Sequence, residues 1–261
     1  MSVILDAQGL TKNFGAVTAA NEVSAAIEKD SVVGLIGTNG AGKTTFINIV
    51  TGYLKPDRGS IAYEGRDITR LPPRDITRLG ICRSFQIPQL YGSLSVFDNM
   101  MIGIGIVLRN AGLAGYLSRR AALVPGYGEP AEAVAERILA RFGLLEYRER
   151  NAQVLPGGAR KLLDIALAMV ARPRILLLDE PTSGVSAQEK FGIMQMVLEA
   201  VRAEGATVLF VEHDMEHDME VVSRFAQRVL AFYDGRIIAD APPRDALAHP
   251  EVKRYVVGTR A

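Results

Sequence analysis

Short apolar runs separated by glycine-rich turns occupy both ends of the chain. Near the start, Ser31–Ile36 has the pattern of a buried strand, and Thr45–Val50 after it has the pattern of a helix. Farther along, Ile175–Leu178 is a continuous apolar run. Uninterrupted apolar runs are typical of strands buried on both faces of a parallel sheet. From residue 173 onward strands and helices alternate again, which predicts an α/β fold. The expected elements are Ile175–Leu178, Ala187–Ala203, Ala206–Val211, Met219–Phe225 and Arg228–Tyr233.

The middle of the chain, from about 87 to 172, has a helical pattern instead. Ala131–Phe142 places four apolar residues on one helical face, and Gly143 follows as a C-cap would. Arg109–Pro130 is rich in glycine and contains two prolines, which predicts a long, partly irregular segment. We therefore expect one domain, with a core at about 1–86 and 173–261 and an inserted helical part at about 87–172.

Composition narrows the class of protein. About half of the 261 residues are apolar and the net charge is +1, which indicates a globular protein without a nucleic-acid-binding surface. Cys82 is the single cysteine, so an internal disulfide and a cysteine metal cluster are excluded, and we expect it in the core. The longest apolar run, Met100–Leu108, is far below the roughly 20 residues of a membrane helix. Residues 1–6 do not resemble a signal peptide. We expect the chain in the cytoplasm, with any membrane association provided by a partner.

The stretch between the first buried strand and its helix carries the strongest functional signal. It reads Gly37-Thr38-Asn39-Gly40-Ala41-Gly42-Lys43-Thr44-Thr45 and fills the pattern G-x-x-x-x-G-K-[ST]. A strand, a glycine loop and a helix start direct several backbone N–H groups and the positive end of the helix dipole at one phosphate. Lys43 would reach the β- and γ-phosphates, and the Thr44 hydroxyl would ligate Mg²⁺. The sequence predicts a nucleoside triphosphate site.

Two adjacent acids follow the apolar run Ile175–Leu178. Acids at the carboxyl end of a buried strand meet ligand at the rim of an α/β sheet. Asp179 is expected in the Mg²⁺ shell. Glu180 points differently and could take a proton from an attacking water.

These motifs resemble the ATP-binding subunit of ABC transporters, and most of all the branched-chain amino acid (Liv-type) importer ATPase. The resemblance covers nearly the whole chain and is carried by Gly37–Thr45, Ile175–Pro181, Thr18–Ser24, Thr51–Gly59, Arg83-Ser84-Phe85-Gln86, Val211–Met215 and Pro250–Tyr255. It implies a mixed, largely parallel sheet with an antiparallel β part, plus an inserted helical subdomain. It also implies ATP and Mg²⁺ as ligands.

The resemblance assigns roles to further residues. Phe14 matches the aromatic residue that stacks on adenine, and Gln86 matches the glutamine that contacts Mg²⁺ and water. His213 matches the histidine that senses the γ-phosphate. Gly157 and Gly158 match the signature motif, which caps the ATP held by a second subunit. The loop 183–186 matches the segment that crosses the dimer interface, although Ser186 stands where an Asp or Asn is usual.

The signature departs from the family pattern. The usual Leu-Ser-Gly-Gly-Gln is here Leu155-Pro156-Gly157-Gly158-Ala159, so a hydroxyl, a backbone N–H and an amide are lost. A charge-assisted hydrogen bond is worth about 1.5–3 kcal/mol, so we expect weaker dimer closure and not its complete loss. The helix expected at Ala159–Val170 keeps its N-terminal dipole. Arg160 and Lys161 would add positive potential near the phosphate.

A short duplication surrounds His213. Glu212-His213-Asp214-Met215 is repeated at once as Glu216-His217-Asp218-Met219. The first copy follows the strand directly, whereas the second fits the family spacing when counted back from Arg228. We favour a four-residue insertion of about one helical turn, with His213 as the functional copy. A metal site formed by His213 and His217 is the alternative.

The resemblance implies ATP hydrolysis that drives solute import through separate transmembrane permease subunits. The expected assembly is a homo- or heterodimer of ATPase subunits on the inner face of the membrane, served indirectly by a periplasmic solute-binding protein. An exporter ATPase that extracts lipid, for example, and a weak or regulatory ATPase in a heteromeric pair remain alternatives. An ABC ATPase acting on ribosomes or DNA is disfavoured, because it needs a tandem second site or a long coiled coil.

Overall fold

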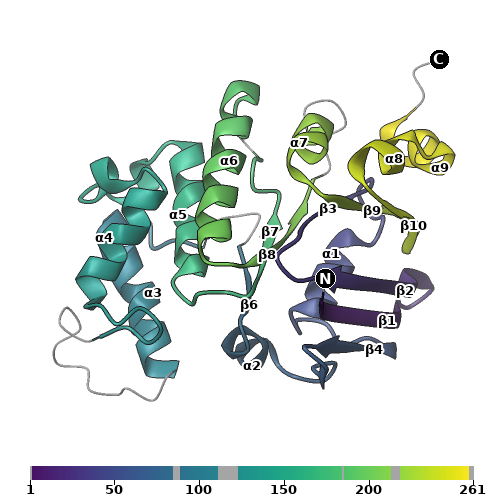
Figure 1. Ribbon diagram of the computed structural model, residues 1–261, viewed down its shortest axis with the longest axis horizontal. Coiled ribbons are helices and arrows are strands. Elements are labelled where there is room, and N and C mark those ends of the chain that lie inside the picture. Colours follow the sequence, from purple (N-terminus) through teal and green to yellow (C-terminus); the bar gives the residue numbers. More distant parts are fainter. Residues whose placement is uncertain (1, 85–88, 111–122, 184, 213–217, 259–261) are drawn as a thin grey trace.

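The computed structural model describes residues 2–84, 89–110, 123–183, 185–212 and 218–258. A six-stranded sheet with the order β10-β9-β3-β8-β7-β6 forms its centre (Figure 1). The strands pair in parallel except for β10, which is antiparallel to β9. Their bounds are β3 Val32–Ile36, β6 Ile81–Arg83, β7 Ile175–Asp179, β8 Thr207–Val211, β9 Arg228–Tyr233 and β10 Arg236–Ala241.

A second, antiparallel sheet covers one face of the helix that follows β3. It has the order β2-β1-β4-β5, with β1 Val3–Phe14, β2 Val17–Glu28, β4 Arg58–Tyr63 and β5 Arg66–Asp67. Helix α1, Lys43–Val50, contributes Phe46, Ile47, Ile49 and Val50 to a hydrophobic cluster that contains residues of both sheets. The expectation of a mixed, largely parallel sheet with an antiparallel β part is confirmed.

The central strands are buried on both faces, as their uninterrupted apolar runs predict. Leu176 and Leu178 of β7 pack in the cluster that faces the helices, whereas Ile175 and Leu177 pack in the cluster around α1. The same alternation separates Val208 and Phe210 of β8 from Leu209 and Val211. Successive side chains of a strand point to opposite faces, so one short strand supplies both cores.

Helices cover the other face of the large sheet and extend beyond it. Helices α3, α4 and α5 gather at the end of the molecule opposite the antiparallel sheet (Figure 1). The bounds are α2 Pro73–Arg78, α3 Val96–Asn110, α4 Ala131–Arg141, α5 Gly157–Met169, α6 Ala187–Ala203, α7 Asp218–Phe225, α8 Pro243–Ala248 and α9 Pro250–Val252. Two 3₁₀ turns span Leu145–Tyr147 and Ala152–Val154, and a π-helical turn spans Lys253–Val257.

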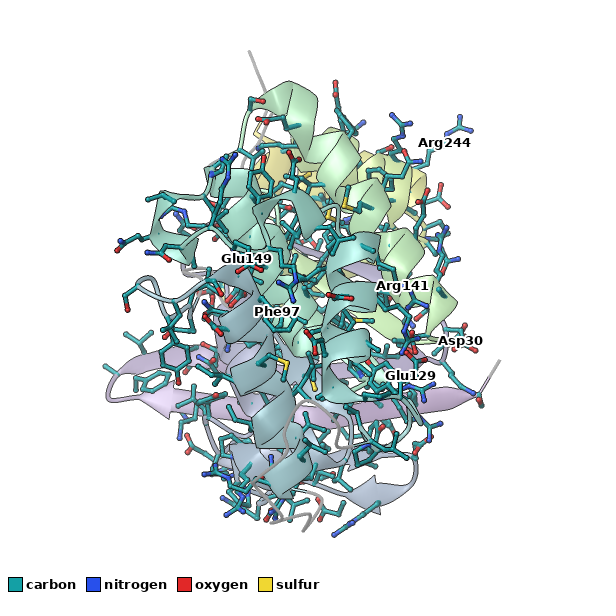
Figure 2. All side chains as sticks on the ribbon, turned by 90° about the vertical axis from the view of Figure 1, so that its left-hand side faces the viewer. Asp30, Phe97, Glu129, Arg141, Glu149 and Arg244 are labelled. Carbon is teal, nitrogen blue, oxygen red and sulfur yellow. The ribbon has the colours of Figure 1, made fainter. Side chains whose placement is uncertain are left out.

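The helical end is held by apolar packing and by arginines. Val134, Ala135 and Ile138 of α4 are buried as expected, and Gly143 has the positive φ of 62° that suits the end of a helix. The Arg148 guanidinium carbon lies 3.9 Å from the centroid of the Phe97 ring. Figure 2 shows Phe97 and Arg141 at this end of the molecule. Arg141 pairs with Glu204 and so ties α4 to the end of α6. The boundary of the helical part at about 87–172 stays a prediction.

Some local expectations need adjustment. The signature helix begins at Gly157 and not at Ala159, so both glycines lie in its first turn. The segment expected to be irregular begins inside α3, and its last part is a turn closed by a bridge between Leu123 and Pro130. Residues 111–122 lie outside the described residues. In the described part of the chain, every helix lacks the length or the hydropathy needed to span a membrane.

Candidate functional site

The glycine loop between β3 and α1 can only be built from glycine at its two tightest positions. Gly37 has φ +151°, and a Cβ there would lie 2.4 Å from the carbonyl oxygen of Phe232. Gly42 has φ +108°, and its Cβ would lie 2.8 Å from the carbonyl oxygen of Ala19. The loop is therefore pressed between β9 and the β1–β2 hairpin. This close approach fixes the backbone that precedes the N-terminus of α1.

The side chain of Lys43, the first residue of α1, folds back into the glycine loop that precedes the helix. Its ammonium donates hydrogen bonds to the carbonyl of Gly37 and, at 3.1 Å, to the carbonyl of Thr38. Burial lowers the pKa of Lys43, and the negative charges of Glu180 and Asp179 oppose this shift. Both acids are therefore close enough to stabilise the charged form. The structure brings Lys43 and the acid pair together, as their assignment to one site requires.

The acid pair stands at the carboxyl end of β7, beside the end of β8. Asp179 and Glu180 are both buried, and Asp179 aligns with Val211 in the parallel ladder. Glu180 has φ +50°, an uncommon conformation for a residue that is not glycine. Its N–H donates to the carbonyl of Val211 at 3.2 Å. Asp179 is thus the last residue of the strand, whereas Glu180 begins the turn that follows it.

The end of β8 lies between the glycine loop and the acid pair, because β8 separates β3 from β7 in the sheet. Glu212 is fixed there: its N–H donates to the carbonyl of Leu35, and Thr182 Oγ donates to its carboxylate at 3.0 Å. His213 and His217 lie outside the described residues, so the choice between them stays a prediction. Among the residues that are described, no group of three or more His, Cys, Asp or Glu side chains could hold a metal ion.

Of two further expected site residues, Phe14 is described by the structure and Gln86 is not. Phe14, at the end of β1, is half exposed, and the Lys12 ammonium lies 5.8 Å from its ring centroid. An exposed aromatic on the hairpin that borders the glycine loop is free to stack on a base. Gln86 lies outside the described residues, just after β6, whose neighbour is β7.

The signature residues open helix α5. Pro156 precedes the helix, and Gly157 is exposed in its first turn. Lys161, one turn further on, was expected to add positive potential near the phosphate, but it is buried: only 2% of the residue is exposed, and its ammonium donates to the carbonyl of Asp179 at 3.3 Å. Its long side chain crosses the short distance between α5 and β7. The charge of Lys161 therefore lies beside the acid pair of its own chain. Of the two basic residues, Arg160 is the one that remains exposed.

Ser186 has a local structural role in the loop after the acid pair. It is the N-cap of α6, and its hydroxyl donates to the Glu189 carboxylate at 2.5 Å, while its N–H donates to the same group at 3.3 Å. This pairing explains why a serine fits at the start of the helix.

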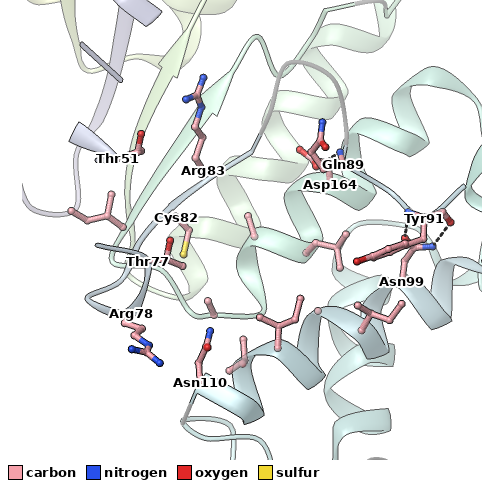
Figure 3. Close-up of a pocket in the computed structure, with 18 of the residues that line it drawn as sticks. Thr51, Thr77, Arg78, Cys82, Arg83, Gln89, Tyr91, Asn99, Asn110 and Asp164 are labelled. Carbon is pink, nitrogen blue, oxygen red and sulfur yellow. Dashed lines mark hydrogen bonds between the residues drawn. The ribbon is translucent and has the colours of Figure 1, made fainter. Parts of the chain in front are cut away.

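A groove of about 960 Å³ separates the core from the helical end. Its walls come from the end of α1, from α2 and β6 on one side and from α3 and α5 on the other (Figure 3). Tyr53, Tyr91 and Ile106 along it are exposed. Cys82 lines it too but is 95% buried, and burial raises the pKa of its thiol to about 12.

Comparison with known proteins agrees with this geometry. Residues 20–183 match the family model described as ABC transporter. The chain belongs to the ABC transporter family. It is 35% identical to a probable branched-chain amino acid transport ATP-binding protein, LivG, of Archaeoglobus fulgidus, over 98% of this chain and 96% of the relative. The high-affinity protein BraF of Pseudomonas aeruginosa is 34% identical, with 98% of each chain covered.

A solved structure leads to the same family. The ADP conformation of an ATP-binding cassette of an ABC transporter superposes with a TM-score of 0.82 at 30% identity, and 99% of this chain and 100% of that chain are covered. The fold is that of the ABC ATPases, and the chain is an ATP-binding, ATP-hydrolysing subunit. The expectation of an ABC ATPase is confirmed.

The residues present suit the ligands of this family. The glycine loop leaves room for backbone N–H groups to approach a phosphate, and Lys43 is already among them. Thr44, in the first turn of α1, and Asp179 offer a hydroxyl and a carboxylate, the hard oxygen ligands that Mg²⁺ prefers.

Sequence reasoning did not assign a role to Arg83. Its guanidinium pairs with the Asp179 carboxylate at 2.5 Å. Its position at the end of the strand that neighbours the acid strand becomes apparent only once the order of the sheet is known.

The glycine loop yields a first prediction. Gly37→Ala should lower the free energy of unfolding and the affinity for ATP, because the new Cβ would collide with the backbone of β9. Gly40→Ala, at φ +80° with open space around it, should cost only the backbone strain, about 1–2 kcal/mol. Urea unfolding and ATP titration of both variants measure the difference. Equal losses of unfolding free energy and of ATP affinity in the two variants would mean that the contact with Phe232 does not constrain the loop.

Proposed function

We propose that this ATPase powers the import of branched-chain amino acids, or of related small amino acid or amide solutes, through separate membrane permeases. The observation that carries this proposal is the 32–35% identity over 98% of the chain to proteins named as branched-chain amino acid transport ATP-binding proteins. The chain would work in the cytoplasm, on the inner face of the membrane. A solute-binding protein would deliver the solute to the permease and would not touch this subunit.

Within the site, each residue has a distinct task. The loop residues Gly37, Thr38, Asn39, Gly40, Ala41, Gly42, Lys43, Thr44 and Thr45 would hold the phosphates, and Phe14 would stack on adenine. Thr44, Asp179 and Gln86 would hold Mg²⁺, which supplies charge neutralisation when bound. Glu180 would orient or deprotonate the attacking water, and His213 would hold the γ-phosphate.

A second ATPase subunit would complete the site. Gly157, which is exposed, and Gly158, which is half-buried, lie in the first turn of α5 and would offer backbone donors to the nucleotide of the partner. Pro156 and Ala159 remove a hydroxyl, a backbone N–H and a side-chain amide from this contact, which favours the second candidate function, a weaker ATPase within a heteromeric pair. Comparison of ATP turnover by the chain alone and with its permease distinguishes the two.

The groove beside β6 suits a segment of the permease. It is formed by the core and by the helical end together, so a helix or loop seated in it would contact both. Movement of the helical end during ATP binding and hydrolysis would then act directly on the membrane subunit. Exposed Tyr53, Tyr91 and Ile106 offer the apolar and aromatic contacts that such an interface uses.

The central test concerns Glu180. Glu180→Gln keeps the shape of the side chain but removes the base, so it should bind ATP, trap a closed dimer and lose nearly all turnover. Lys43→Ala should lose binding as well, because Lys43 contacts phosphate in the ground state too. Steady-state ATPase rates and ATP binding by both variants provide the measurement. Turnover by Glu180→Gln within a few-fold of wild type would remove Glu180 from its role.

The duplicated histidine gives a separate test. The strand that ends at Val211 runs beside the glycine loop, and His213 is two residues beyond it, whereas His217 is about one helical turn further. His213→Ala should cut turnover by roughly 10²-fold, the effect of losing one transition-state donor. His217→Ala should change turnover little. The opposite ranking would assign the role to the second copy.

The groove assignment can be tested by charge. Ile106→Glu should reduce co-purification of the permease from membranes, because a carboxylate would be buried in the interface without a partner. Leu145→Glu is the matched control: Leu145 is equally exposed but does not line the groove among the described residues. Equal retention of the permease by both variants would argue against docking in this groove.

A further inference from the structure

Arg83 lies where the groove meets the proposed magnesium site. It ends β6, next to β7, and one of its terminal nitrogens is 2.5 Å from Asp179 Oδ2. The other terminal nitrogen donates to Asn48 Oδ1 on α1 at 2.6 Å. The same side chain lines the groove, at the edge where Thr51 also stands (Figure 3). One guanidinium therefore touches the acid strand, the helix of the glycine loop and the groove.

The pair between Arg83 and Asp179 is almost fully shielded from water. Only 10% and 7% of the two side chains are exposed. Charges that are shielded in this way interact strongly, because little solvent or salt screens them. Asp179 is also the carboxylate proposed for the Mg²⁺ shell, so the Arg83 guanidinium and Mg²⁺ would both bind the same carboxylate. A guanidinium held at this position both occupies an oxygen of Asp179 and repels a divalent cation.

We propose that Arg83 competes with Mg²⁺ for Asp179 and thereby couples occupancy of the groove to the nucleotide site. This inference rests on the proposed function for both the metal and the groove. A permease segment that offers a carboxylate or carbonyl to Arg83 draws the guanidinium toward the groove. The Asp179 carboxylate is then released to Mg²⁺, and the subunit binds Mg²⁺–nucleotide best when it is assembled with its permease.

Arg78 provides a natural comparison. It lines the same groove, but its ion-pair partner is Asp75, at 3.4 Å, on the same short helix. Both of those side chains are about two-fifths exposed, so the pair contributes little. Removing Arg78 takes the same charge from the groove without touching Asp179.

The first experiment measures ADP binding by the full chain as free Mg²⁺ is titrated, with EDTA as the metal-free point. Arg83→Met should lower the Mg²⁺ concentration at half-effect about tenfold, the scale of altering a partner of a metal ligand. Affinity for ADP in EDTA should stay within about twofold, because the glycine loop is untouched. Arg83→Lys should stay nearer to wild type. Asn48→Ala, which frees the guanidinium from α1 only, should alter the half-effect concentration less than Arg83→Met does.

The possible results distinguish failure of the Arg83 competition from failure of the proposed magnesium site. A half-effect concentration that is unchanged or higher in Arg83→Met overturns the competition, and a higher value would mean that Arg83 orients Asp179 for the metal. A shift of the same size in Arg78→Met would mean that any groove cation acts by its charge alone, which also overturns it. If ADP binding by the wild-type chain does not respond to Mg²⁺, the magnesium assignment itself fails.

The second experiment repeats the titration on the complex with the permease. The wild-type complex should reach half-effect at lower Mg²⁺ than the isolated chain, and Arg83→Met should remove this difference. A difference that survives in the Arg83→Met complex would overturn the coupling through the groove. Thermal unfolding of each variant, measured without nucleotide, identifies any variant that fails to fold, and the Lys and Asn48 variants then carry the test.

Discussion

The parallel register of β3, β8 and β7 is the constraint on which the site depends. Leu35 aligns with Val211, and Val211 aligns with Asp179, so three strands from distant parts of the chain end at one level of the sheet. Each strand is short and buried on both faces, and a slip of one residue would exchange the residues of its two cores. Hydrophobic packing thereby fixes the relative positions of the glycine loop, Glu212 and the acid pair before any ligand binds.

The elements that could be predicted are those whose pattern has a local cause. The strands Ile175–Asp179 and Arg228–Tyr233 and the helix Ala187–Ala203 match their expected ranges within one residue, because unbroken apolar runs and helical periodicity are properties of the segments themselves. Helix α3 was not predicted as a separate element, and Gly103 and Gly105 interrupt its apolar run. The reason for Gly103 is tertiary: a Cβ there would lie 2.8 Å from the Leu167 side chain on α5.

The residues of the site also divide into those with a local sequence signal and those placed only by tertiary structure. The glycine loop and the acids after β7 are contiguous motifs, and the sequence is enough to bring them together once a parallel sheet is assumed. Lys161 and Arg83 could not be placed in this way. Lys161 was expected to add positive potential near the phosphate, yet it is buried and donates to the carbonyl of Asp179. The residues beside it in the sequence do not show how close α5 lies to β7. Arg83 pairs with a carboxylate 96 positions away in the sequence.

The burial of Cys82 has a practical consequence. The chain has a single thiol, and that thiol is shielded and remains protonated at neutral pH, so it reacts slowly with reagents that attack the thiolate. Thiol-specific reagents should therefore label the native protein very little. A cysteine introduced at an exposed position, on either wall of the groove, can carry a spectroscopic probe without prior removal of the natural one. Distances between such probes, measured with and without nucleotide, would test the proposed movement of the helical end relative to the core.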